Sequence, residues 1–66
     1  MPANSIIRNA AAMRGVRFWQ IAHEMGIHEG SLSRKLRFEL PEEEQQRIVG
    51  IINDIADARE RSFGNA

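Results

Sequence analysis

The chain has 66 residues and no cysteine, which excludes more than one small domain, a disulfide framework and a thiolate metal site. Its nine basic and nine acidic residues cancel, so the overall charge neither favours nor disfavours a polyanionic partner. The sequence also lacks an apolar run near the roughly 20 residues of a membrane span, and it lacks the pattern of a signal peptide. We therefore expect one all-α domain, residues 1–66, in the cytoplasm, with no membrane contact, metal, cofactor or small-molecule ligand.

The charges are divided unevenly between the two halves. Residues 1–37 contain six basic and two acidic residues, whereas residues 38–66 contain three basic and seven acidic ones, giving formal charges of +4 and −4. The helix dipole favours acidic residues at the start of a final helix and explains part of this division. The positive potential therefore lies on the first half of the chain.

Two helices are predicted first, over residues 5–14 and from Phe18 to the residue before Gly26. Asn4 or Ser5 is a suitable N-terminal cap for the first helix, and Gly15 is a suitable C-terminal cap. The second helix has one apolar stripe at helical spacing, formed by Phe18, Ile21, Ala22 and Met25.

Two further helices are predicted over residues 29–37 and 41–61. Leu32 and Leu36 lie four residues apart, on one face of the third helix. Pro41 discourages helical geometry in Leu40 and suits the start of a new helix, whose first turn is acidic. These patterns predict a compact bundle of four helices, and leave open a fifth.

Residues 18–37 have the pattern of a helix-turn-helix. Such a motif needs a small residue where its helices cross, a residue able to adopt positive φ in the turn, and apolar residues that fix the second helix. Ala22, Gly26 and Leu32 meet these needs, and Leu36 completes the inward face. An ordinary helical hairpin with a glycine cap is the alternative.

The stretch "IAHEMGIHEGSLSR" resembles the Xre-type, lambda-repressor-like and Cro-like family of bacterial and phage DNA-binding regulators, whose core reads like "LAxxLGVSxxTLSR". The "FWQIA" before it and the "RKLRFELPEEEQQRI" after it also resemble small members of that family. The resemblance implies a small transcriptional regulator of bacterial, phage or mobile-element origin that binds double-stranded DNA through residues 29–37. The chain departs from the family at His28, where a serine or threonine usually caps the recognition helix.

The resemblance assigns base-edge contacts to Glu29, Gly30 and Arg34, with Ser33 close by. A step of about 100° per residue places Arg34 nearly opposite Leu32 and Leu36, and an outward arginine suits a bidentate contact to guanine. The alternative for Arg34 is a solvated side chain or an interaction with Glu29 or Gln20. Glu29 suits a cytosine amino group and the helix dipole equally, and Gly30 suits a close approach to DNA or is a tolerated surface glycine.

Other polar residues of the first half are candidates for phosphate contacts, which position a protein on DNA without reading its sequence. They are the cations Arg14, Arg17, Lys35 and Arg37 and the neutral donors Gln20 and Ser31.

An enzyme is not expected, because the chain has no glycine-rich phosphate loop and no cluster of acid and base residues. The rival function is a protein-interaction or dimerisation module without DNA binding, which would use the stripe formed by Ile48, Ile51, Ile52 and Ile55. The same stripe would serve a DNA-binding homodimer whose two recognition helices meet successive major grooves. We also expect Trp19 to pack against the last helix, and Phe38 and Leu40 to anchor the linker in the core.

Overall fold

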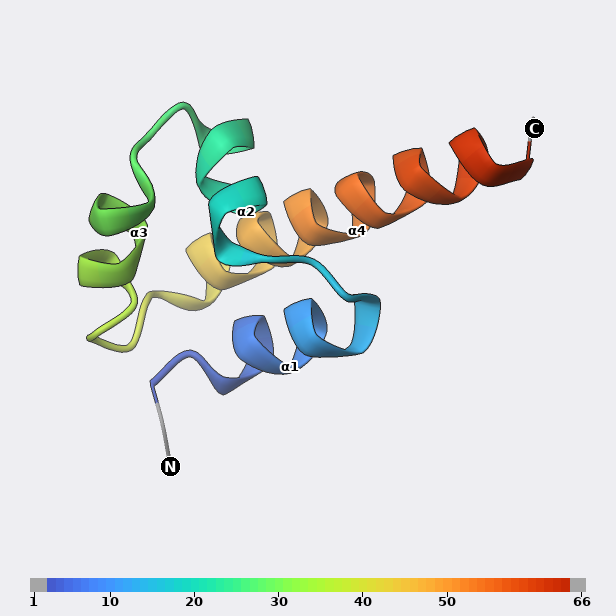
Figure 1. Cartoon of the computed structure of the whole chain (residues 1–66). Coiled ribbons are helices and arrows are strands. Elements are labelled where there is room, and N and C mark those ends of the chain that lie inside the picture. Colours follow the sequence, from blue (N-terminus) through green and yellow to red (C-terminus); the bar gives the residue numbers. More distant parts are fainter. Residues whose placement is uncertain (1–2, 65–66) are drawn as a thin grey trace.

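The computed structural model describes residues 3–64, which form four helices and no strand within that range. The helices are α1 (Ser5–Arg14), α2 (Phe18–Met25), α3 (Glu29–Lys35) and α4 (Glu42–Gly64). Figure 1 shows α1 and α4 side by side and running in the same direction, with α2 above them and α3 at one end. The all-α prediction is confirmed, and the predicted boundaries agree with the structure at α1 and α2.

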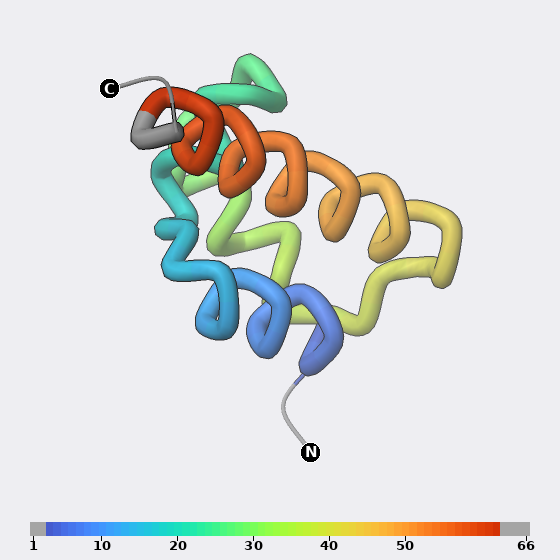
Figure 2. Tube along the Cα trace, turned by 90° about the vertical axis from the view of Figure 1, so that its right-hand side faces the viewer, coloured from blue at the N-terminus to red at the C-terminus, as the bar shows by residue number. Residues whose placement is uncertain are grey.

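The core is formed where α1, α2 and α3 pack around the first two-thirds of α4. Figure 2 shows α1 and α4 side by side from a second direction. The buried apolar side chains come from all four helices and from the α1–α2 connection: they are Ile7, Ala11, Val16, Ile21, Ala22, Leu32, Leu36, Ile48, Ile52 and Ala56. The last turns of α4 extend past the other helices, which makes the molecule elongated at 40 × 22 × 18 Å.

Glycines end α1 and α2 in the same way. Gly15 and Gly26 have φ of 64° and 73°, in the left-handed region that costs glycine little and other residues more. The next residue then bonds back into the helix, through Val16 N–H to Ala11 O at 2.9 Å and Ile27 N–H to Ala22 O at 3.0 Å. These bonds satisfy carbonyls that a helix end leaves free, so both helices end where their glycines predict.

Asn4 does not cap α1 as expected, although it occupies the capping position. Its backbone is left-handed with φ of 60°, and its side chain makes no hydrogen bond to the first turn of α1. The fully buried side chain instead binds the connection between α3 and α4. Its Nδ2 donates to Leu36 O at 3.0 Å and to Phe38 O at 2.9 Å, and its Oδ1 accepts from Leu40 N–H at 2.8 Å.

The helix α3 ends at Lys35, two residues before the predicted end, and its last turn is tightened, since Arg37 N–H donates to Arg34 O at 3.2 Å. In a continuing helix, Leu40 N–H would donate to Leu36 O. The Asn4 amide stands between these two groups and satisfies both, so the backbone leaves the helix without a glycine. Glu39 extends the network, because one carboxylate oxygen accepts from Asn4 N–H at 2.8 Å and the other from Gln45 Nε2 at 2.8 Å.

Two aromatic predictions were wrong. Trp19 is 54% exposed and does not pack into the core against α4, and Phe38 is 77% exposed on the α3–α4 connection. Of the two predicted anchors, only Leu40 packs against the core, beside the buried Asn4 side chain.

Candidate nucleic-acid interface

The helix α3 is fixed to the core by one apolar face. Leu32 and Leu36 are fully or almost fully buried, and Ala22 of α2 is buried at the crossing of the two helices. The turn that joins α2 to α3 contains Gly26 with its left-handed backbone. Apolar burial and a left-handed glycine thus hold α3 against α2.

The opposite face of α3 is open to solvent and carries the four candidate base-contacting residues. Glu29, Gly30, Ser33 and Arg34 are all exposed. Within residues 3–64, the side chains of this face form no hydrogen bond or ion pair with the protein, so the alternative pairing of Arg34 with Glu29 or Gln20 is not present. Arg34 points away from Leu32 and Leu36, as the helical period requires.

The start of α3 has no side-chain cap. His28 occupies the capping position with an extended backbone, and its carbonyl accepts from Ser31 N–H at 3.0 Å and Leu32 N–H at 3.1 Å. Its imidazole makes no capping hydrogen bond. The departure at His28 thus replaces the hydroxyl cap typical of the resembled family with solvated backbone groups.

Two candidate phosphate contacts remain exposed cations. Arg17 precedes α2 and Arg37 follows α3, and neither takes part in an ion pair within the described part of the chain. Gln20 is partly occupied, because its Oε1 accepts from Arg17 N–H at 2.8 Å, and this leaves its amide NH₂ group to donate outward. Ser31, within α3, is half-buried.

Arg14 differs from Arg17 and Arg37, because its guanidinium has partners within the molecule. Its guanidinium binds Asp57 at 2.8 Å and Glu60 at 3.4 Å on α4, and also Asn53 Oδ1 at 3.4 Å. The hydrogen bond to Asp57 is the main cause that raises the pKa of Arg14 above its ordinary value. Because α1 runs beside the acidic part of α4, the charge of Arg14 is paired with carboxylates of the same chain.

Lys35 is also paired within the molecule. Its ammonium group forms an ion pair with Glu44 in the first turn of α4, the turn that the helix dipole makes favourable for acidic residues. Lys35 is therefore engaged with α4 in the single chain, and its predicted phosphate contact would require this ion pair to open.

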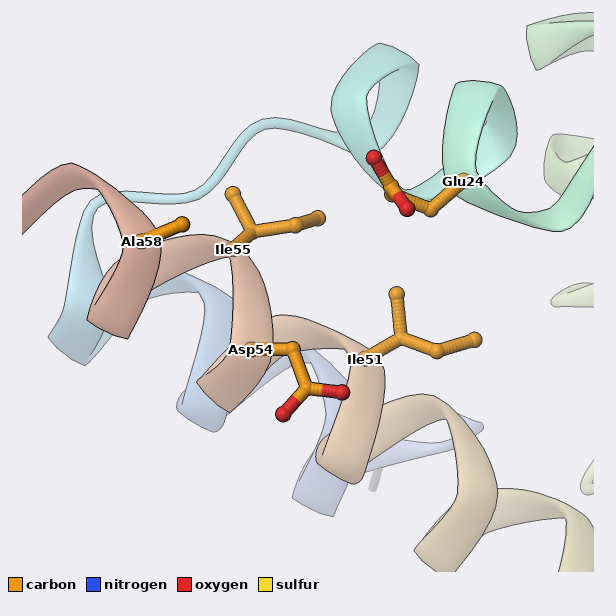
Figure 3. A pocket seen from close by; sticks show the side chains of 5 residues that line it. All are labelled: Glu24, Ile51, Asp54, Ile55 and Ala58. Atoms are coloured by element: carbon orange, nitrogen blue, oxygen red, sulfur yellow. The ribbon is translucent and has the colours of Figure 1, made fainter.

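The stripe of four isoleucines is divided between the core and the surface. Ile48 and Ile52 have no exposed surface and belong to the core, so they cannot form a dimer contact as expected. Ile51 and Ile55 are half-buried and line a groove of about 190 Å³ between α2 and α4, together with Ala58, Glu24 and Asp54. In Figure 3, Glu24 extends from α2 and Asp54 from α4 at the sides of these isoleucines.

Asn4 is the one residue that organises this region and that the sequence did not identify. An asparagine before a helix indicates a cap, and nothing near it in sequence indicates contacts 32 to 36 residues away. The only local signal is the absence of a glycine or other C-cap residue after Leu36, which requires some other group to satisfy the last carbonyls of α3.

Comparisons with known proteins give no match to a protein-family model, a curated protein or a solved structure. None of the helices described over residues 3–64 has both the length and the apolar composition that crossing a membrane requires.

Proposed function

We propose that this chain is a lambda-repressor-like, sequence-specific double-stranded DNA-binding domain that acts as a small cytoplasmic transcriptional regulator of bacterial or phage origin. In this proposal α3 enters the major groove as the recognition helix. The observation that carries it is the division of α3 into a fully buried face, Leu32 and Leu36, and an exposed face centred on Arg34. A helix held rigidly by one face presents the other at a fixed position, which base readout requires.

The roles of the residues follow from their place around α3. Arg34 donates to O6 and N7 of a guanine, and Gly30 lets the helix backbone approach the base edges. Glu29 accepts from a cytosine amino group, and Ser33 contacts an adjoining base. Arg17 and Arg37 bind phosphates on either side, with Gln20 and Ser31 as neutral donors.

The ion pairs of Arg14 and Lys35 within the molecule change the expected salt dependence. Arg14 and Lys35 are already paired with carboxylates, so they release few counterions on binding. With Arg17 and Arg37 as the main phosphate contacts, log Kd should change with log salt with a slope of about 2 per copy, since each phosphate contact contributes about 0.9. A steeper slope would mean that the acidic partners are displaced on binding.

The test begins with selection of bound duplexes from a random pool, followed by fluorescence anisotropy over a salt series. We expect Arg34→Ala to weaken the selected duplex by about 1–3 kcal/mol, roughly 5- to 150-fold, and to remove the preference at one base pair. Arg17→Ala should weaken all duplexes similarly and lower the salt slope by about 1. Arg61→Ala is the matched control, because it removes the same charge from the far end of α4.

If no duplex from the pool shows salt-sensitive binding, the regulator function is wrong. The rival function, an interaction module without DNA binding, would then account for the molecule. If binding occurs but Arg34→Ala and Arg61→Ala behave alike, α3 is not the recognition helix.

A further inference from the structure

Phe38 and its neighbour Arg37 form an exposed projection that the single chain does not cover. Phe38 is 77% exposed and Arg37 is exposed, within the α3–α4 connection. The backbone beneath them is held firmly, because Asn4 Nδ2 donates to Phe38 O at 2.9 Å. A large aromatic side chain on a fixed backbone loses little conformational entropy when it is buried by a partner.

The groove between α2 and α4 is complementary to this projection in its apolar lining and in its charge. Its apolar lining is Ile51, Ile55 and Ala58, and its volume is about 190 Å³. An apolar cavity of about 150 Å³ accommodates a benzene ring, so a phenyl group fits a space of this size. Glu24 and Asp54 stand at the sides (Figure 3), and neither carboxylate has an ion-pair partner within the described residues.

The projection cannot enter the groove of its own molecule. Phe38 lies before the start of α4, whereas the groove lies along its middle, about 15–20 Å further on at 1.5 Å per residue. The hydrogen bonds from Asn4 prevent the connection from swinging across that distance. Phe38 can therefore enter this groove only on another molecule.

We propose that the chain associates head to tail with a second copy of itself, in which Phe38 of one copy enters the α2–α4 groove of the next and Arg37 pairs with Glu24 and Asp54. An aromatic anchor beside a cation matches an apolar pocket flanked by two carboxylates, and such complementarity selects one register. The contact joins two different surfaces, so each dimer retains one free projection and one free groove, and further copies add at high concentration.

The test uses the directionality of this contact. Phe38→Ala removes the projection, and Glu24→Lys with Asp54→Lys in one variant removes the charge match of the groove. All three side chains are exposed, so both variants should fold, and circular dichroism checks this. Mass is measured by light scattering and analytical ultracentrifugation up to about 1 mM, the limit of a weak specific contact.

The wild-type chain should exceed its monomer mass of 7.5 kDa progressively with concentration. Self-association of each variant alone should be at least tenfold weaker than that of the wild-type chain. An equimolar mixture of the two should form a dimer and nothing larger, because one copy supplies the projection and the other supplies the groove. Met13→Ala, which alters another exposed apolar side chain, should associate like the wild type.

Two results would overturn the proposal. One is a wild-type chain that stays monomeric throughout, in which case the groove serves no second copy. The other is a wild-type oligomer that both variants still form, or that the mixture fails to restore, which would place the contact elsewhere. None of these measurements involves DNA, so failure of this proposal is distinguishable from failure of the regulator function; within an oligomer, an Arg37 paired with a groove is not free to bind phosphate.

Discussion

Replacement of Asn4 should reveal how strongly the α3–α4 connection depends on one side chain. Asn4→Ala removes the donor to Leu36 O and Phe38 O and the acceptor for Leu40 N–H. An alanine at this position must also keep a left-handed backbone, which asparagine tolerates better.

The expected cost follows from these contacts. The bond to Leu36 O is buried, and a buried group left without a partner costs about 1–3 kcal/mol. The other two bonds are partly buried, so water can replace part of what the backbone groups lose. With about 1 kcal/mol for the left-handed alanine, the total loss is about 3–5 kcal/mol. A chain of this length is stabilised by about 3–10 kcal/mol in all, so the loss is a large fraction.

Urea denaturation followed by circular dichroism measures this loss, and Asn4→Gly is the matched control. The glycine variant loses the same side-chain hydrogen bonds, but glycine adopts the left-handed backbone at little cost. The Asn4→Gly protein should therefore be about 1 kcal/mol more stable than the Asn4→Ala protein. Hydrogen exchange should increase at Leu40 and change little at Ile27, whose amide bonds within the α2–α3 turn. A loss below about 0.5 kcal/mol, typical of a surface substitution, would refute the reasoning.

Three further outcomes are expected. Gly26→Ala should cost about 1–2 kcal/mol in urea denaturation, because only its left-handed backbone opposes a side chain, and an equal or higher stability would contradict this. A Cβ at residue 30 would meet no neighbouring atom, so Gly30→Ala should raise the free energy of unfolding by up to about 1 kcal/mol. If the backbone approaches the bases closely, anisotropy should show that the same variant binds DNA more weakly. The N–H of Asn4, and secondarily the Gln45 amide, lower the pKa of Glu39 below its ordinary value of 4.5. The associated stability is present above pH 4.5 and is lost as pH falls through the lowered pKa, so Glu39→Gln should flatten this part of the stability profile in acid titrations.

Local sequence features determined where the helices lie and which faces of them are buried. The ends of α1 and α2 at Gly15 and Gly26 follow from backbone preferences that act within a few residues. The inward direction of Leu32 and Leu36, and hence the outward direction of Arg34, follows from the period of the helix alone. These properties need no knowledge of the remaining chain, which explains their agreement with the structure.

The pairing of charges depended on tertiary neighbours. Arg14, Lys35 and Arg37 look equivalent in sequence, as basic residues at the ends of short helices. Only the packing of α1 and α3 against the acidic α4 places carboxylates beside the first two and leaves Arg37 exposed. The candidate site therefore contains fewer free cations than the sequence indicates.

The sequence by itself thus determined the four helices, the turn at Gly26 and the solvent-facing side of α3, because these depend on spacing and backbone conformation over a few residues. Tertiary structure alone decided which group binds Leu36 O after α3, which isoleucines of α4 remain accessible, and that Trp19 and Phe38 lie outside the core. The reason is physical: each of these depends on a contact with a distant segment. A buried Asn4 amide that replaces a helical hydrogen bond 36 residues away leaves no trace in local spacing.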